Sequence, residues 1–257
     1  KKKKKKKKKN PKKNTKKNQQ YIYIFYFYYL FFINLFFINL FTINIMCINE
    51  KVSLATFTIC SLSCFYLYKR NNINDRWIAI IFAYLGSMQL LEYLMWKDQE
   101  CKGLNQFATN IGFIHNILQP VISLLIAYYF TDGKIPSYIY IIFIVYLATS
   151  LPEIIRMKKS NQCSLPCNDG EVGLSWKYTN TNYPTYVWGI FCLALIAPFL
   201  SMKGNGKVYG GIIMGIYILA HLISIKRCPD NQGTPPNGSW WCMMAALVPL
   251  LAIKINK

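Results

Sequence analysis

Glu92 is the residue best suited to a chemical role in this chain, because it is an acidic residue inside a long apolar stretch. A carboxyl group is costly in hydrocarbon, so it usually faces a protein interior or an aqueous cavity, where it marks a proton relay, a solute path or a ligand site. Gln89 lies one helical turn earlier and would share its face. Both histidines of the chain, His115 and His221, also lie in apolar stretches.

Small and polar residues recur at intervals of three and four around each histidine, which predicts one polar face on each of two helices. The face around His115 contains Gly112, Asn116, Gln119 and Ser123. The face around His221 contains Met214, Tyr217 and Ser224, beside Gly211 and Gly215, whose spacing permits close helix contact. Such faces do not favour lipid, so we expect both to point into the protein.

The helical rise places the acid and the two histidines at a similar depth in a membrane. Glu92 lies about 6 Å below Trp96 at 1.5 Å per residue. The same rise puts His115 about 12 Å and His221 about 8 Å below that membrane surface. We therefore predict a polar layer in which Glu92 holds a proton or pairs with an imidazolium. The alternative is that Glu92 only ties helices together through hydrogen bonds.

Other chemistries have little support in the sequence. The two histidines lie on different segments, and no third ligand follows a recognisable spacing, so a catalytic zinc site has little support, although Glu92 could complete a set of two imidazoles and one carboxylate. The chain contains no GxSxG, HExxH or phosphate-binding glycine motif. We therefore expect no catalytic residue, metal or cofactor, and a membrane-embedded metal hydrolase ranks third among the functional hypotheses.

Seven apolar segments would position these residues, each bounded by polar side chains that enter hydrocarbon at high cost. They are residues 52–68, 77–96, 107–130, 138–151, 186–202, 208–226 and 240–255. Trp77 and Trp96 bracket the second segment, which makes about 30 Å of helix with an indole at either interface. Pro120, Pro198 and Pro249 lie inside segments and can mark kinks. The pattern predicts an all-α, polytopic membrane protein with seven transmembrane helices.

Four cysteines fall in the polar connections: Cys101, Cys163, Cys167 and Cys228. With seven crossings, these connections share one side of the membrane. Thiols gathered on one face favour two disulfides in an oxidising compartment, with three possible pairings. This predicts that the Met46 side is outer or lumenal and that Lys257 is cytoplasmic. A four-cysteine zinc site on a cytosolic face is the alternative, which the absence of a CxxC pair disfavours.

The charge of the chain is concentrated at its start. The 257 residues carry a formal net charge of +20 and are 53% hydrophobic. Residues 1–20 hold 13 lysines and no acid, and without them the net charge is +7. We interpret residues 1–45 as translation of AT-rich DNA upstream of a start at Met46. The alternative is a signal anchor with an extra N-terminal hydrophobic helix. A lysine homopolymer without interleaved aromatic residues does not predict nucleic-acid binding.

Three strings in the sequence carry a family resemblance. Residues 86–96 read Gly-Ser-Met-Gln-Leu-Leu-Glu-Tyr-Leu-Met-Trp, residues 118–120 read Leu-Gln-Pro, and residues 238–242 read Gly-Ser-Trp-Trp-Cys. Together they resemble uncharacterised multi-pass membrane proteins of giant viruses of protists and some of their algal or protist relatives. The resemblance covers most of residues 46–257. It implies a fold and a viral-like source but no activity, and it directs attention to Gln89, Glu92, Trp96, Gln119 and Trp240.

The spacing of the segments permits an internal repeat. Segments one to three recur as five to seven with offsets of 134, 131 and 133 residues, as in transporters built from two helix triplets and a linking helix. We expect residues 46–257 to form one transmembrane domain with an outer loop at 152–185.

Small-solute or proton-linked transport across a lipid bilayer is the leading functional hypothesis. The membrane would be a host endomembrane, the plasma membrane or a virion membrane. The alternative is a receptor-like or structural membrane protein without transport or catalysis, which would work through its outer loop. A cavity that reaches Glu92 favours transport, whereas a closed core with an exposed outer patch favours the alternative.

Overall fold

The computed structural model describes residues 49–70, 72–157, 163–166, 173–176, 185–227 and 237–255. All of these belong to one compact unit, Cys47–Lys257. The predictions for residues 1–45, for Cys167 and Cys228 and for most of loop 152–185 lie outside the described ranges.

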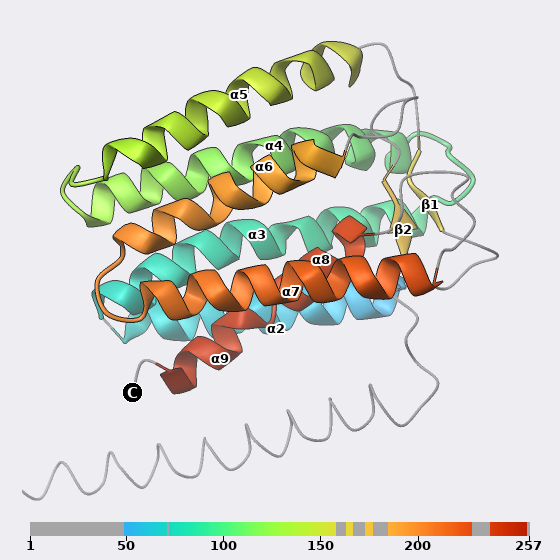
Figure 1. Ribbon diagram of the computed structural model, residues 1–257. Coiled ribbons are helices and arrows are strands. Elements are labelled where there is room, and N and C mark those ends of the chain that lie inside the picture. Colours follow the sequence, from blue (N-terminus) through green and yellow to red (C-terminus); the bar gives the residue numbers. More distant parts are fainter. Residues whose placement is uncertain are drawn as a thin grey trace, which may run out of the picture. The chain divides into compact units, whose positions relative to one another are not determined.

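The described part of the chain is almost entirely helical (Figure 1). Its helices are α2 (Glu50–Lys69), α3 (Ile73–Lys97), α4 (Leu104–Phe130), α5 (Ser137–Met157), α6 (Thr185–Ile196), the 3₁₀ helix η1 (Ala197–Ser201), α7 (Gly206–Arg227), α8 (Asn237–Ala245) and α9 (Val248–Ile255). Two short strands, β1 (Leu165–Pro166) and β2 (Leu174–Ser175), pair antiparallel with Leu165 opposite Ser175. Each predicted apolar segment therefore coincides with helical structure.

Five helical stretches in the described residues are long and apolar enough to cross a bilayer: Glu50–Lys69, Ile73–Lys97, Leu104–Phe130, Gly206–Ser224 and Gly238–Ile255. Two further apolar helices, Ser137–Pro152 and Tyr186–Ser201, are shorter. The helical architecture therefore fits a lipid environment, as expected. Crossing by all seven segments and the two-triplet arrangement stay predictions.

Local sequence explains several helix boundaries. Asn49 caps α2 by accepting a hydrogen bond from the Val52 N–H at 3.1 Å. Pro198 lies in η1, where α6 tightens into a 3₁₀ turn, and Pro249 lies in the first turn of α9, just after the break that separates it from α8. Proline lacks an N–H to donate, so both residues lie where regular α-helical bonding is interrupted.

α3 is the centre of the packing, because it contacts α2, α4, α8 and α9. The helices from α2 to α8 run in alternating directions and α9 continues the direction of α8 (Figure 1), so the two strands and the turn after α3 lie at one end of the bundle. Trp77 is only 2% exposed and packs against Phe130 and Phe199. The indole therefore fills the bundle interior and does not face lipid, and its predicted depth at a membrane interface stays a prediction.

Glycines permit close approach on α3 and α4, but Gly211 and Gly215 of α7 do not take part in such contacts. A Cβ on Gly86 would lie 2.4 Å from the Cys60 Sγ, and one on Gly112 would lie 2.9 Å from the Met88 Cε. At Gly211 and Gly215 an added Cβ would meet nothing within 4 Å. The predicted close helix contact at these two α7 glycines is therefore not made within the described residues.

Candidate functional site

Glu92 lies on the inward face of α3 and is completely buried. Its Oε2 accepts a hydrogen bond from Gln89 Nε2 at 2.5 Å, one helical turn away. Its Oε1 accepts a hydrogen bond from the indole Nε1 of Trp176 at 3.1 Å, across 84 residues of sequence. Trp176 directly follows β2. The carboxyl group is therefore held at both oxygens, once within its own helix and once by the strand segment.

The first turns of α8 complete the surroundings of this carboxyl group. The Ser239 hydroxyl is buried beside it without reaching hydrogen-bond geometry. The buried thiol of Cys242 lies near it, one turn further along α8. Gly238 lies directly against the indole, since an added Cβ would be 2.1 Å from a Trp176 ring carbon. Together these side chains join α3, the segment after β2, and α8. We call them the Glu92 cluster, which consists of Gln89, Glu92, Trp176, Ser239 and Cys242.

Residues 98–103, 163–166 and 173–176 form a cap at this end of the bundle (Figure 1). A disulfide joins Cys101 to Cys163, with their Cα atoms 6.1 Å apart. This bond fits the prediction that loop cysteines on one side of the protein are oxidised. The predicted partners Cys167 and Cys228 lie outside the described residues.

Ser164 fastens the cap to α4 through a buried hydrogen-bond network. Its backbone N–H lies 2.9 Å from Asn105 Oδ1 and 3.1 Å from Thr109 Oγ1. Its carbonyl oxygen accepts from Asn105 Nδ2 at 2.8 Å, and that same amide nitrogen donates to the Met95 carbonyl at 3.0 Å. Buried polar groups need such partners, so the network fixes the position of the cap. The sequence does not indicate this network, because Ser164 lies in a loop without a periodic pattern.

Asp98 organises the turn that leads from α3 into α4. Its carboxylate accepts hydrogen bonds from the backbone N–H groups of Asn105 at 3.0 Å and Lys102 at 2.8 Å. These bonds hold the pKa of Asp98 below its usual range. The N-cap residue of α4 is Gly103, which has no side chain to cap the helix. Asp98 therefore supplies the acceptor that an N-cap side chain would normally provide.

His115 binds a part of α3 away from Glu92. Its Nε2 lies 2.9 Å from the Tyr84 carbonyl oxygen and 2.8 Å from Ser87 Oγ. A carbonyl oxygen can only accept, so the imidazole proton is on Nε2. Nδ1 is then the acceptor for Gln119 Nε2, 3.4 Å away. The ring also stacks on Tyr84 with centroids 4.2 Å apart. His115 therefore ties α4 to α3 and is not placed as a base for Ser87.

The predicted polar layer does not assemble. The Glu92 cluster contains no histidine, His115 binds Tyr84 and Ser87, and His221 lies half-buried on α7. The expected pairing of Glu92 with an imidazolium is therefore wrong. Among the described residues, no three His, Cys, Asp or Glu side chains are grouped to hold a metal ion. The ligand set that the hydrolase hypothesis requires is thus not formed.

The polar face of α4 points inward, as predicted. Gly112, Asn116, Gln119 and Ser123 are all buried. Gln119 Nε2 donates to Asn116 Oδ1 at 2.8 Å, and Ser123 Oγ donates to the Leu195 carbonyl at 3.1 Å. This face therefore mediates packing between helices.

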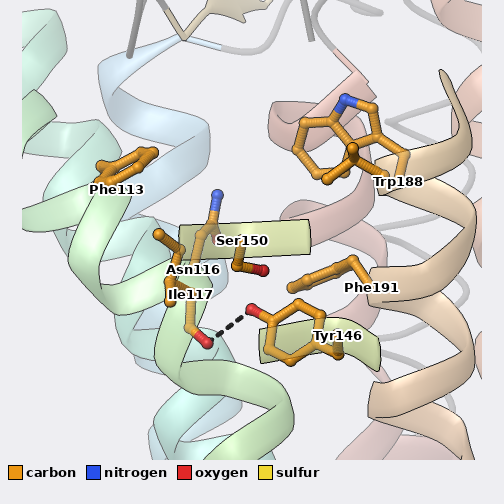
Figure 2. Close-up of a pocket in the computed structure, with 8 residues that line it drawn as sticks. Phe113, Asn116, Ile117, Tyr146, Ser150, Trp188 and Phe191 are labelled. Atoms are coloured by element: carbon orange, nitrogen blue, oxygen red, sulfur yellow. Dashed lines mark hydrogen bonds between the residues drawn. The ribbon is translucent and has the colours of Figure 1, made fainter. Parts of the chain in front are cut away.

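A cavity of about 30 Å³ lies between α4, α5 and α6 (Figure 2). Of the predicted site residues, Asn116 lines it and Glu92 does not. The Tyr146 hydroxyl, from α5, donates to the Ile117 carbonyl of α4 at 2.7 Å. The full lining is Phe113, Asn116, Ile117, Tyr146, Ser150, Val187, Trp188 and Phe191. The cavity is thus separate from the carboxyl group that the transport hypothesis requires.

A second buried carboxylate lies near the opposite end of α3. Asp75 is fully buried and pairs with Arg70, with 3.0 Å between Oδ2 and Nε. The Arg70 Nη1 also donates to the Ile253 carbonyl at 3.0 Å, which ties this end of α3 to α9. The interval from Asp75 to Glu92 corresponds to about 26 Å of helix, close to the thickness of a hydrocarbon core. Asp75 was not among the predicted site residues, although an acid in the first turn after an N-cap such as Asn72 is a recognised signal of a helix start.

The comparisons with known proteins add no relative from which a role could be inferred. No family model, curated protein or solved structure matches the chain significantly. The structure itself defines the class: a helical bundle suited to a membrane, in which two buried acids fasten the central helix to its neighbours.

Proposed function

We propose that this chain is an integral membrane protein that acts through its cap, as a receptor-like or structural protein without transport. The observation that carries the proposal is the placement of Glu92. Its carboxyl group is completely buried and both its oxygens accept hydrogen bonds, one of them from the Trp176 indole of the cap. A group that fastens the cap in this way has a structural task.

Three independent attachments support a rigid cap. The Cys101–Cys163 disulfide joins its two sides, Ser164 bonds to α4, and Trp176 bonds to Glu92 of α3. A surface held at three points is preorganised, so a partner binds it without the entropic cost of ordering loops. This arrangement supports recognition at the membrane surface.

The depth of the acidic residues supports the same interpretation. Asp75 and Glu92 lie near opposite ends of α3 and each is engaged by a neighbouring residue. A proton path needs ionisable groups that line water across the membrane. The cavity between α4, α5 and α6 does not include either acid in its lining.

We further propose that all seven apolar segments cross the bilayer, with the cap outside or in the lumen and Lys257 in the cytoplasm. The alternating helix directions and the disulfide in the cap support this topology (Figure 1). The shorter segment Ser137–Pro152 makes about 24 Å of helix, which a bilayer accommodates by local thinning. The viral-like source implied by the family resemblance remains a proposal of the same kind.

A proton-flux measurement tests the non-transport role. The full chain is reconstituted into liposomes that contain a pH-sensitive dye, and a pH gradient is imposed. We expect wild type, Glu92→Gln and protein-free vesicles to lose the gradient at the same rate. The matched control is Glu100→Gln, because the Glu100 side chain is 74% exposed in the cap. Wild-type flux that Glu92→Gln abolishes and Glu100→Gln leaves intact would contradict the proposal and support transport.

Labelling with a membrane-impermeant amine reagent tests the topology. Lys102, in the cap, has a side chain 77% exposed. Lys254 lies in the last turn of α9. We expect intact cells to be labelled at Lys102 and permeabilised cells at both lysines. Labelling of Lys254 alone in intact cells would contradict the proposed topology and show the opposite orientation.

A further inference from the structure

Exposed lysines gather at the end of the bundle opposite the cap (Figure 1). They come from the last turn of α2, from the region where α7 begins and from the last turn of α9, and they are Lys69, Lys203, Lys207 and Lys254. We call these four residues the basic patch. We propose that the basic patch binds the headgroups of anionic phospholipids in the adjoining leaflet of the membrane.

Hydrogen bonds between the helix ends hold the basic patch together. Arg70, one residue after the lysine of α2, donates from Nη1 to the Ile253 carbonyl, one residue before the lysine of α9, at 3.0 Å. Asn205 lies between the two lysines of the α7 region, and its Nδ2 donates to the Ile255 carbonyl of α9 at 3.4 Å. The ends of α2 and α9 and the start of α7 are thus tied to one another, so the four lysines lie on one surface.

The positive charge of the basic patch is not neutralised by ion pairs. Its lysines pair with no acid in the part of the chain that the structure describes. Asp75, at the same end of α3, is fully buried and pairs with Arg70, so it presents no negative charge to this surface. Near the cap, by contrast, Lys97 pairs with Glu50 at 2.9 Å. The basic patch therefore attracts a partner that brings negative charge.

The depth of these lysines favours a lipid over a soluble partner. One helical turn further into the bundle, exposed apolar side chains face outward, with Phe65 of α2 64% and Leu251 of α9 50% exposed. The Lys69 ammonium lies over the Phe65 ring, 5.5 Å from its centroid. Its charge is thus held where the apolar surface ends, which is where lipid phosphates lie. Clusters of four or more basic residues beside membrane helices bind anionic lipids in this way.

The inference rests on the proposed integration into a bilayer, which determines the lipids that the basic patch meets. In the proposed topology this end of the bundle faces the cytoplasmic leaflet, whose anionic lipids give it a negative surface potential. Phosphate and carboxylate oxygens of such lipids accept charge-assisted hydrogen bonds from ammonium groups. Phosphatidylcholine also has a phosphate, but its own quaternary ammonium cancels the charge. The basic patch should therefore distinguish lipids by net charge.

Counting bound lipids by native mass spectrometry tests this inference. The purified full chain in neutral detergent micelles is titrated with phosphatidylserine or with phosphatidylcholine of the same acyl chains. We expect wild type to bind phosphatidylserine at least about fivefold more tightly, which is the contribution of one engaged lysine. The preference should shrink as salt is added, because salt screens exposed charges.

Two double variants with the same change in net charge locate the binding. Lys203→Gln with Lys207→Gln removes half of the basic patch and should lower the affinity for phosphatidylserine at least about fivefold. The control, Lys97→Gln with Lys102→Gln, removes two lysines that pair with acids near the cap and should leave the affinity unchanged. Amine acetylation of wild type needs no substitution: phosphatidylserine, but not phosphatidylcholine, should slow the modification of Lys203 and Lys207 and spare that of Lys102.

The inference is overturned if wild type binds the two lipids equally, a result that would leave the basic patch to an acidic protein. Equal loss of phosphatidylserine in both double variants would overturn it as well. Soluble glycerophosphoserine should not displace the lipid, and displacement at the concentration of the lipid would show a site for free phosphate instead. Binding of neither lipid would overturn the inference together with the proposed membrane integration. The flux experiment and the orientation do not affect these outcomes, because both ends of the protein are accessible in micelles.

Discussion

Replacing Glu92 with leucine removes both acceptors of the Glu92 cluster at nearly constant side-chain volume. The donors Gln89 Nε2 and Trp176 Nε1 then stay buried without an acceptor. Each such orphaned donor costs about 1–3 kcal/mol, so we expect the free energy of unfolding to fall by about 2–6 kcal/mol. Since about 1.4 kcal/mol is a tenfold change in an equilibrium constant, the cluster should open at least about 30-fold more often.

Glu92→Gln should have a much smaller effect, for a reason visible in the structure. The Oε1 of Gln89 is buried and has no hydrogen-bond partner among the described residues. The new amide at position 92 can keep its oxygen towards Trp176 and offer its NH₂ group to Gln89. Rotation of the Gln89 amide by a half turn then satisfies both groups. We expect a loss below about 1 kcal/mol, within the range of one net hydrogen bond.

The reactivity of the Cys242 thiol reports opening of this cluster. Cys242 is a free cysteine, 1% exposed, and lies near Glu92. Thiol labelling in detergent micelles is followed for each cysteine by mass spectrometry, and its rate follows local opening when reclosing is fast. Cys60 is equally buried between α2 and α3 and serves as the internal control.

We expect Glu92→Leu to accelerate labelling of Cys242 at least about 30-fold and that of Cys60 much less, with Glu92→Gln close to wild type. Labelling of Cys242 at the wild-type rate in Glu92→Leu would show that the carboxyl group does not hold the cluster. Equal acceleration by both variants would show that charge, rather than hydrogen bonding, is what Glu92 supplies.

Two further predictions concern the cap and α7. Gly238→Ala should lower the free energy of unfolding by about 1–3 kcal/mol, because the added Cβ would lie 2.1 Å from the Trp176 ring. Its control Gly211→Ala should be stabilising by up to about 1 kcal/mol, since that helical site is open; equal thermal denaturation of the two variants would contradict this. The lowered pKa of Asp98 means that its bonds stabilise the turn at neutral pH and are lost as pH falls below the ordinary value of about 3.9. The protection factor of the Asn105 amide, which is its exchange rate corrected for the intrinsic pH dependence of exchange, should therefore fall at low pH in wild type. Asp98→Ala should show a low protection factor at every pH, and a wild-type protection factor that stays constant with pH would refute the assignment.

The helices were predictable from the sequence because the apolar segments and their polar boundaries are strong signals. The inward face of α4 was predictable for the same reason, since small and polar residues recur there at helical spacing. The break between α8 and α9 was signalled by Pro249. The pattern did not reveal that Trp77 is buried, because a tryptophan at the end of an apolar segment fits a buried aromatic cluster as well as a lipid interface.

The contacts of the site were not predictable in the same way. Helical rise gives the depth of Glu92 and His115 but not the direction in which each side chain leaves its helix. The two residues therefore have similar predicted depth and different partners, namely Trp176 for Glu92 and Tyr84 for His115. The Trp176 contact spans 84 residues and comes from a two-stranded segment too short to produce a periodic pattern.

The indole N–H of Trp176 offers the most direct test that Glu92 fastens the cap to α3. The exchange of this proton with solvent can be measured by NMR on ¹⁵N-tryptophan-labelled protein in micelles, with the resonance assigned through Trp176→Phe. The structure predicts slow exchange in wild type and in Glu92→Gln, and exchange at least about 30-fold faster in Glu92→Leu. A Trp176 indole that exchanges in wild type as fast as an exposed tryptophan would contradict the account.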